Sequence, residues 1–537
     1  MTSAPTRGMG SSRRRLVLVL TLVVLHGVLA WLMRSPGVRW GEDDAEYSIL
    51  ARQLAHGSYR DVWFVDAPIE TRYPPGYPAL LAASNVALGE HVSVQLVVML
   101  CFSAASLILL YDVVRRRLGD SAAVFVAGLC AINPGWVSEA GRLMAESPFR
   151  FWTILTLWSA SIENPRARHL VVAGAAAVFS ALTRSAGVSV IAALLLFWLL
   201  ERRWKAAAYL LLASIPVGVW LLWTGLAPNT DRGVVYVHAI SSGLVPNAQK
   251  TWTAQLARMA ARAWQYIRTV TPASLSLFGL KRNPLDNFAW AALLVLTLPL
   301  GLVVLWKRWR LAVLMIGVYG AVLMLWPYAE PRFVSPINGL LLAVIASGVV
   351  ALAHRWSSAG WGLALTGVSS LFVAGSVQTT MPRALGSLKC DRSPAAEASE
   401  CFREDERGLL QLARFARSGT APRSIFFTPK EGAWYFHTLR RSIRESVGDA
   451  VPADALGAYL RRAGVEYAVV TPIGVARRTH NNLIAHACRD FEPVSAFDGD
   501  ALLLRVRADG PLDHDDAACQ LTAPWKDGVP ARWQAFP

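Results

Sequence analysis

Long apolar segments dominate the first 378 residues of the chain, and short basic turns separate many of them. An apolar helix of about 20 residues spans the hydrocarbon core of a bilayer, which is about 30 Å thick. The pattern therefore predicts an α-helical multi-pass membrane protein with about 11 spans. The candidate spans are residues 16–33, 92–113, 121–137, 143–162, 169–183, 186–200, 206–223, 288–306, 311–327, 336–353 and 359–378.

The third to sixth segments are short for a span. We expect them to be tilted, to lie in thinned bilayer around a cavity, or to form two re-entrant hairpins. Two hairpins would leave the orientation of the later spans unchanged.

The basic turns indicate how the spans are oriented. If the N-terminus lies in the cytosol, each even-numbered span returns the chain there, and each is followed by Arg or Lys. Cytosolic loops carry such an excess of basic residues. Three large pieces then lie on the outer face, namely residues 34–91, residues 224–287 and everything after about 379. We divide the chain into a membrane domain, 1–378, and an extracytoplasmic domain, 379–537.

The second outer loop contains apolar residues at helical spacing, with arginines elsewhere on the helical wheel. This spacing is typical of a helix that lies on the membrane surface. An ordinary helix of a small outer domain is the alternative. The apolar positions are Trp252, Leu256, Met259, Ala263 and Ile267.

Residues 379–537 have a different composition, with polar residues throughout and no span. Residues 424–427, 467–470 and 501–506 are typical of strands, and residues 452–463 have helical spacing, which predicts a small α/β domain. The region has no phosphate-binding loop, zinc-ligand spacing or nucleophile elbow. We therefore assign it accessory contacts.

Charge and composition narrow the class of protein. The chain is 54% hydrophobic and 17% charged, whereas soluble proteins are about 25% charged. The net charge is +16, and the basic residues fall in short clusters between the apolar segments. They therefore indicate the orientation of the spans. No nucleic-acid-reading motif accompanies the arginines, so nucleic acid is not expected as a partner.

Four of the six cysteines fall in the polar C-terminal region, and an even number in an oxidising compartment predicts two disulfides. Free thiols in a cytosolic tail are the alternative. The four disulfide candidates are Cys390, Cys401, Cys488 and Cys519.

The first outer loop opens with four carboxylates in five positions, Glu42, Asp43, Asp44 and Glu46. Carboxylates at a membrane surface are expected to stay ionised in contact with water, without a large pKa penalty. They can then act as a general base or as metal ligands. A solvated loop is the alternative.

Isolated charges at the predicted outer ends of spans are the other candidates. Arg72, Arg184 and Arg332 carry guanidinium groups, which suit a lipid phosphate because they are permanently charged and forked. Pairing with a headgroup or a nearby carboxylate is the alternative. Glu146 opens the fourth span and is a functional candidate, with helix capping as the alternative. The proline-rich stretch 73–78 is expected to be extended and to hold Arg72 in place.

Five short motifs, each at an outer membrane edge and in this order, resemble those of the glycosyltransferase-C (GT-C) superfamily over residues 16–378. The resemblance is to the bacterial family that includes the aminoarabinose transferases and is related to the protein O-mannosyltransferases. Asp44 stands where that family has Glu, Tyr73 where aminoarabinose transferases have Lys, and Glu146 where Asp is common. The motifs are Asp43–Tyr47, Tyr73–Pro78, Met144–Pro148, Leu182–Arg184 and Arg332–Pro336.

This resemblance implies a GT-C fold and a polyprenyl-phosphate-linked sugar donor. It also implies action on the outer face of the bacterial cytoplasmic (inner) membrane. The acceptor would be a glycolipid, a glycan or a protein, and membrane lipids would be partners. Asp43 would be the catalytic carboxylate, with Asp44 and Glu146 beside it. The predicted substrate-binding residues are Tyr47, Arg72, Tyr73, Arg184 and Arg332.

We expect Asp43 to deprotonate an acceptor hydroxyl while Arg184 and Arg332 stabilise the departing phosphate. A divalent cation, Mg²⁺ or Mn²⁺, shared by Asp43 and Glu146 is left open. A transporter or flippase of lipid-linked sugars and a non-catalytic scaffold are the competing functions. The sequence predicts no interrupted helix pair, and the acids of the first outer loop favour an enzyme.

Overall fold

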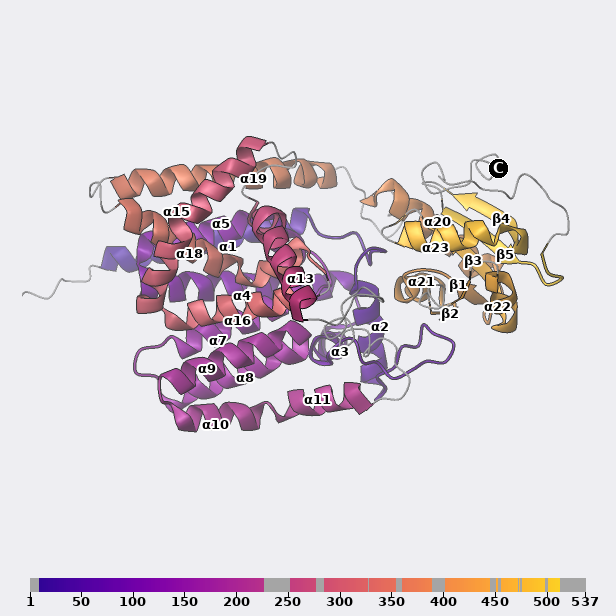
Figure 1. Ribbon diagram of the computed structural model, residues 1–537, viewed down its shortest axis with the longest axis horizontal. Coiled ribbons are helices and arrows are strands. Elements are labelled where there is room, and N and C mark those ends of the chain that lie inside the picture. The colour runs from indigo at the N-terminus through magenta and orange to yellow at the C-terminus, as the bar shows by residue number, and fades with distance from the viewer. Residues whose placement is uncertain are drawn as a thin grey trace, which may run out of the picture. The chain divides into compact units, whose positions relative to one another are not determined.

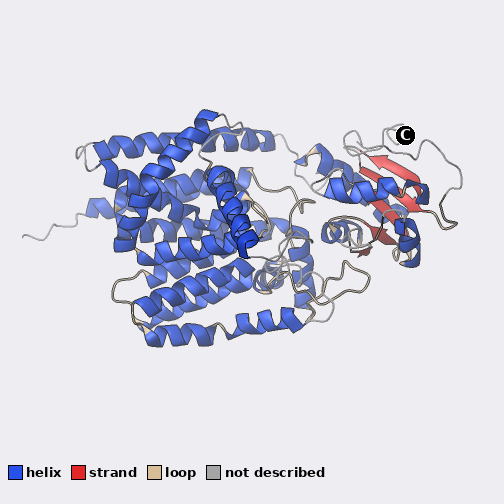
Figure 2. Ribbon diagram, viewed as in Figure 1, coloured by secondary structure: helices blue, strands red, loops and turns tan. Residues whose placement is uncertain are grey.

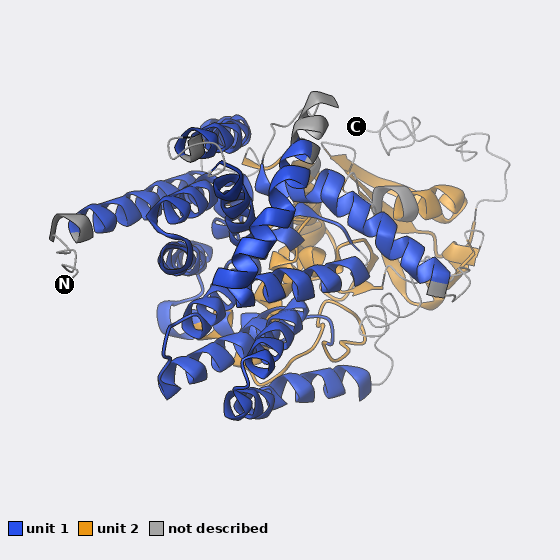
Figure 3. Ribbon diagram, turned by 60° about the vertical axis from the view of Figure 1, so that its left-hand side comes forward, with its two compact units in different colours: residues 1–34, 71–80, 84–387 blue, residues 35–70, 81–83, 388–537 orange. Residues whose placement is uncertain are grey.

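The computed structural model describes residues 9–226, 252–276, 284–326, 328–353, 360–388, 401–444, 451–452, 455–471, 473, 476–497 and 501–511. Its contacts divide the chain into two compact units (Figure 3). Unit 1 comprises Met1–Arg34, Thr71–Leu80 and Ser84–Ser387, and unit 2 comprises Ser35–Glu70, Leu81–Ala83 and Leu388–Pro537.

The described part of unit 1 is helical (Figures 1 and 2). Its helices are α1 (Met9–Leu32), α3 (Gly76–Leu88), α4 (Val92–Leu118), α5 (Asp120–Ile132), α6 (Pro134–Ala140), α7 (Glu146–Ala160), α8 (Ala167–Thr183), α9 (Val188–Leu200), α10 (Trp204–Ala213), α11 (Ile215–Leu226), α13 (Trp252–Gln265), α14 (Thr271–Leu275), α15 (Pro284–Arg308), α16 (Arg310–Leu325), α17 (Pro331–Val334), α18 (Asn338–Ala353) and α19 (Gly360–Leu388). Short turns η1 (Ser185–Gly187) and η3 (Ser335–Ile337) and a π-helical turn η2 (Tyr266–Val270) join some of them.

Each of the eleven predicted apolar segments contains a helix, but the predicted count of eleven spans is not confirmed. By length and composition, four described helical stretches can cross a membrane: Arg13–Leu32, Val92–Leu118, Pro331–Ala353 and Gly362–Leu388. Two bent helix pairs would raise the number to six. The predicted helix in the second outer loop is α13, and its position on the membrane stays a prediction.

The expectation of no interrupted helix pair is wrong. Helices α5 and α6 meet at 58°, and α10 and α11 meet at 42°. Asn133 explains the first break, because it is extended before Pro134 and its side chain accepts a hydrogen bond from the Trp136 N–H at 3.1 Å. Proline cannot continue the preceding helix but is favoured in the first turn of the next one.

Glycines allow two helices of unit 1 to pack backbone to backbone. A Cβ at Gly301 of α15 would lie 2.1 Å from the Val344 carbonyl oxygen of α18, and one at Gly348 of α18 would lie 2.2 Å from the Thr297 carbonyl oxygen. Small residues permit such close approach between membrane helices. The α15–α18 pair therefore depends on both glycines.

Unit 2 contains the predicted α/β domain, with a five-stranded sheet in the order β2-β1-β3-β5-β4 (Figures 1 and 2). Strand β1 is parallel to β2 and β3, and β5 is antiparallel to β3 and β4. The three predicted strands and the predicted helix are confirmed. The elements are α20 (Glu404–Gly419), β1 (Ile425–Phe427), α21 (Glu431–Thr438), β2 (Ser442–Ile443), α22 (Leu456–Arg462), β3 (Val465–Val470), α23 (Ala476–His486), η7 (Cys488–Asp490), β4 (Phe491–Phe497) and β5 (Ala501–Val506).

Most of the first outer loop, residues 35–70, belongs to unit 2 by its contacts. Its helix α2 (Asp44–Ala55) packs against α21. Further along the loop, the Ser442 N–H donates to the Trp63 carbonyl at 2.9 Å, and the Val65 N–H donates to the Ser442 carbonyl at 3.2 Å. These bonds add a short bridge beside β2. Residues 35–70, which the sequence assigned to the membrane domain, therefore fold with the C-terminal region.

The cysteine predictions are tested only at some positions. Cys488 in η7 is disulfide-bonded. Cys401 is half-buried just before α20, whereas Cys390 and Cys519 lie outside the described residues. The pairing of the four cysteines stays a prediction.

Candidate functional site: the acidic motif and the arginine turns

The acidic motif lies at the start of α2, in unit 2. Asp43 is the N-cap residue and is half-buried, while Asp44, Glu46 and Tyr47 are buried in the first turn. Acidic side chains are stabilising at this position, because the N-terminus of a helix carries a partial positive charge. The motif is thus part of the first turn of a packed helix.

Asp44 is a structural part of this motif. Its Oδ2 accepts a hydrogen bond from the Arg39 N–H at 2.9 Å, and its Oδ1 accepts one from the Ala45 N–H at 3.1 Å. Burial raises the pKa of Asp44 to about 8, with smaller contributions in the same direction from Glu46 and Glu42. The expectation that these carboxylates stay ionised without a large pKa penalty is therefore wrong for Asp44, because its side chain does not reach water.

Residues just before the motif are anchored on the C-terminal helices. Arg39 donates two hydrogen bonds to Glu406 of α20, from Nε to Oε1 at 3.1 Å and from Nη2 to Oε2 at 2.9 Å. Trp40 stacks on His437 of α21, with ring centroids 5.2 Å apart. Burial lowers the pKa of His437 to about 4, so the ring is neutral at pH 7.

The helix α21 also leaves room for the motif. A Cβ at Gly432 would lie 2.6 Å from the Glu46 Cδ, so a larger residue there would push on α2. The sequence did not reveal Glu406, Gly432 or His437 as relevant. They lie more than 350 residues from the motif and form no recognisable pattern with it.

In unit 1 the structure joins two of the predicted site residues. Glu146, the first residue of α7, forms an ion pair with Arg184, the residue that ends α8. The turn after Arg184 is tight, because the Gly187 N–H donates to the Arg184 carbonyl at 2.8 Å. A Cβ at Gly187 would overlap the backbone of Ser180. Local sequence therefore fixes where the guanidinium emerges.

Arg332 reaches the same place from α17. The Arg184 guanidinium lies 5.5 Å from the centroid of the Phe333 ring, and that of Arg332 lies 5.2 Å from it. Arg332 Nε also lies 2.6 Å from Glu330 Oε2. Both arginines thus have a carboxylate partner, as the alternative interpretation expected, and both lie against one ring. We call Glu146, Arg184 and Arg332 the arginine site.

The stretch around Arg72 approaches the end of α8. A Cβ at Gly76 would lie 2.7 Å from the Leu182 carbonyl oxygen, two residues before Arg184. The Arg72 guanidinium lies 4.8 Å from the Tyr73 ring centroid. The expectation that residues 73–78 are extended throughout is wrong, because α3 begins at Gly76 and a proline in a first helical turn displaces no intrahelical hydrogen bond.

A metal site is not visible in these residues. Among the described residues, no group of three or more His, Cys, Asp and Glu side chains is placed to hold a metal ion. The role of Asp43 and Glu146 as metal ligands stays a prediction.

Comparisons with known proteins agree with this architecture. Residues 72–223 match the model of a family described as dolichyl-phosphate-mannose-protein mannosyltransferase. Among solved structures, the chain is similar to ArnT from Cupriavidus metallidurans bound to undecaprenyl phosphate. The TM-score is 0.54 at 14% identity, over 93% of this chain and 99% of that one.

The fold is that of the GT-C glycosyltransferases. A second similar structure is the Archaeoglobus fulgidus oligosaccharyltransferase tethered to an acceptor peptide, with a TM-score of 0.53 and 13% identity over 92% of this chain and 75% of that one. A third is AglB from the same organism with an inhibitory peptide and a dolichol-phosphate, with a TM-score of 0.50 and 13% identity over 84% and 69%. No curated protein sequence matches the chain.

The predicted GT-C resemblance is therefore confirmed at the level of the fold. The family match covers Arg72, Tyr73, Glu146 and Arg184, but it ends before Arg332 and begins after Asp43. The roles of all these residues in the GT-C fold of this chain stay predictions.

Proposed function

We propose that the protein is an integral-membrane glycosyltransferase that moves a sugar from a polyprenyl phosphate to an acceptor hydroxyl on the outer face of the cytoplasmic membrane. The observation that carries this proposal is the GT-C fold. It matches, over nearly the whole of both chains, a structure that holds undecaprenyl phosphate. The helices that are long and apolar enough to cross a membrane are consistent with it.

In the proposed reaction the acceptor oxygen attacks the anomeric carbon. The bond from that carbon to the phosphate oxygen breaks, the lipid phosphate leaves with the electron pair, and the acceptor proton passes to Asp43. Asp43 suits the role of base because it is half-buried at the N-cap position, at the start of α2. Asp44 is proposed to help as a neutral group that keeps the motif in shape, since both of its oxygens bind backbone N–H groups.

The arginine site is proposed to bind the phosphate. Negative charge concentrates on the phosphate as the sugar leaves, and cations fixed in advance stabilise such charge better than water does. A guanidinium presents five N–H donors in a planar fork, and this arrangement suits a phosphate. The Glu146 contact would hold Arg184 in place for this task.

Glu146 is proposed to have a second function. Its Oε2 atom is buried and accepts no hydrogen bond from the described residues. A hydroxyl of the sugar or of the acceptor could donate to it, or a Mg²⁺ or Mn²⁺ ion could bind there. Tyr47, Arg72 and Tyr73 are proposed to complete the binding of the donor. The acceptor is proposed to be a glycolipid, a glycan or a protein.

A transporter or flippase of lipid-linked sugars is the second candidate. The two bent helix pairs favour it, because interrupted helices are common in transporters. The two functions differ in their product, since only a transferase makes a new glycosidic bond.

The test uses membranes that contain the protein and a panel of polyprenyl-phosphate sugars labelled in the sugar. With the wild type, the proposal expects label in a new product whose sugar is no longer linked to polyprenyl phosphate. With Asp43→Asn at equal protein level, it expects no labelled product. A labelled donor that crosses the bilayer without a new glycosidic bond would support the transporter instead. Label transfer by Asp43→Asn at the wild-type rate would refute the role of Asp43.

A further inference from the structure

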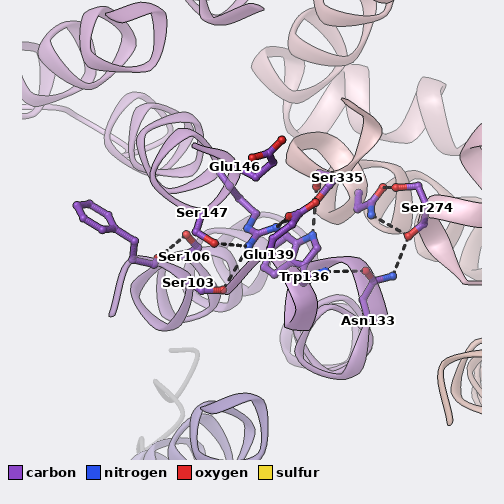
Figure 4. Close-up of polar contacts among 12 residues, drawn as sticks. Ser103, Ser106, Asn133, Trp136, Glu139, Glu146, Ser147, Ser274 and Ser335 are labelled. Atoms are coloured by element: carbon purple, nitrogen blue, oxygen red, sulfur yellow. Dashed lines mark hydrogen bonds and ion pairs between the residues drawn. The ribbon is translucent and has the colours of Figure 1, made fainter. Parts of the chain in front are cut away.

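A buried charge in unit 1 is not used by the proposed reaction. Arg150 of α7 is fully buried. Its Nη1 donates to Glu139 Oε2 of α6 at 2.6 Å and to Ser335 Oγ of η3 at 3.0 Å. Ser335 Oγ in turn donates to the same Glu139 oxygen at 2.7 Å (Figure 4). We call Glu139, Arg150 and Ser335 the buried cluster.

Other elements complete the surroundings of the guanidinium. Arg150 Nη2 donates to Ser103 Oγ of α4 at 3.3 Å and to Ser147 Oγ at 3.4 Å. The guanidinium also lies 4.0 Å from the centroid of the Trp136 ring of α6, which is a favourable cation–π distance. The charge is therefore held by groups from α4, α6, α7 and η3.

Trp136 and a further residue, Tyr319, bond to the backbone of the turn that carries Arg332. The Trp136 Nε1–H donates to the Ser335 carbonyl at 3.1 Å, and the Tyr319 hydroxyl donates to the Phe333 carbonyl at 2.8 Å. Together with the bonds to Ser335 Oγ, these contacts fix both the backbone and a side chain of residues 331–337. Arg332 lies at the start of that turn.

The buried cluster is also one helical turn from the other half of the arginine site. Glu146 and Arg150 are four residues apart on α7, so they share a face of that helix. In Figure 4 the Glu146 carboxylate points away from Ser103 and Ser147, while its ion pair holds Arg184. One buried group thus connects α7, which carries Glu146, to the turn that carries Arg332.

Stability alone does not account for this arrangement. Replacing a buried ion pair by apolar residues of similar volume is often neutral or stabilising. Ionisable residues within membrane helices are costly, and they commonly mark functional sites. A guanidinium can bond to several elements at once, because it has five N–H donors. Such a group therefore suits the task of holding two phosphate-binding elements at a fixed separation.

We propose that the buried cluster positions the Arg332 turn against α7, and that Arg150 is a positioning residue for the binding of the lipid phosphate. This inference rests on the proposed function, in which Arg332 and Arg184 bind that phosphate. In this role Arg150 acts through the turn and not by contact with the substrate.

The first test measures whether the buried cluster holds the turn. Backbone amide exchange of residues 332–335 and 337, which have an exchangeable N–H, is compared in the wild type, in the neutral variant Glu139→Gln/Arg150→Met, and in Ser335→Ala. Ser106→Ala is the matched control, because Ser106 Oγ donates to the Phe102 carbonyl within its own helix. We expect exchange at least about tenfold faster in both cluster variants, equivalent to about 1.4 kcal/mol, and no change in the control. Unchanged exchange in the cluster variants would overturn the inference.

The second test measures whether the position of the turn matters for phosphate. Undecaprenyl phosphate is titrated onto the purified protein, and its Kd is measured for the wild type, Ser106→Ala, Ser335→Ala, Arg332→Ala and the double variant Ser335→Ala/Arg332→Ala. We expect Ser335→Ala to weaken binding about fivefold and the double variant to bind no more weakly than Arg332→Ala, because residues that act through one another are not additive. Additive losses, or an unchanged Kd in Ser335→Ala, would overturn the positioning role. Failure of the wild type and of Ser106→Ala to bind would instead overturn the proposed function on which the inference rests.

Discussion

At the scale of single residues, the arginine site shows which predictions a sequence can support. Glu146, Arg184 and Arg332 stand out because each is a charge at the edge of an apolar segment, where orientation rules do not require one. The structure brings the three together through the ion pair and the Phe333 ring. Arg150, inside an apolar segment, and Glu139, just after one, were missed because such charges give no sign of their partners until the helices pack.

The arginine site predicts the effect of removing one cation. Arg332→Ala should lower kcat for sugar transfer several hundredfold, because the loss of one fixed donor to a developing negative charge costs about 3 to 4 kcal/mol. Arg168→Ala, which removes an exposed arginine, is the control and should retain activity. The measurement is turnover with the labelled donor at saturating concentration. Normal turnover in Arg332→Ala would exclude this residue from the site.

Asp44 predicts a pH dependence of stability. Its pKa is raised from 3.8 to about 8 in the folded protein, so the folded state binds the proton more tightly than the unfolded state. Its contribution is therefore favourable below pH 4 and is lost as the pH rises toward 8. Asp44→Asn, which is neutral at every pH, should lose less thermal stability than the wild type between pH 5 and pH 8. An equal change in melting temperature between pH 5 and pH 8 for the two proteins would contradict this account of Asp44.

At the scale of elements, the apolar pattern located the helices well but not their boundaries or bends. Short segments such as α5 and α6 were predicted as one span, and the break between them depends on Asn133 and Pro134. Strand β4 was missed because Pro493 lies within it. A proline is tolerated there because β4 is at the edge of the sheet.

The glycine contacts between α15 and α18 predict a packing defect. Gly348→Ala would place a Cβ 2.2 Å from the Thr297 carbonyl oxygen, so the helices must separate. Overpacking of this kind typically costs about 1 to 3 kcal/mol. The thermal midpoint of the detergent-solubilised protein should fall, whereas Gly367→Ala on α19, whose Cβ would meet open space, should leave it unchanged. Equal midpoints for the two variants would show that the helices are not in such close contact.

At the scale of the whole molecule, the sequence predicted a membrane region and a small α/β region but not which unit contains the acidic motif. Residues 35–70 follow the first span directly, so the chain order assigns them to the membrane domain. Their partners Glu406, Gly432 and His437 lie in the C-terminal region, and only the folded structure shows these contacts.

This grouping predicts that the C-terminal region is required for transfer. A chain ending at residue 387 should insert into the membrane but lose sugar transfer, because α2 and Arg39 would lose α20 and α21. Faster amide exchange in residues 39–55 should accompany the loss. Full transfer by the shortened chain would show that residues 388–537 make only accessory contacts, as the sequence first indicated.

The most direct measurement is an experimental structure of the full chain with undecaprenyl phosphate bound. The account predicts that a phosphate oxygen lies within hydrogen-bonding distance, about 3 Å, of the guanidinium of Arg184, of Arg332 or of both. A phosphate bound away from both arginines would contradict the account.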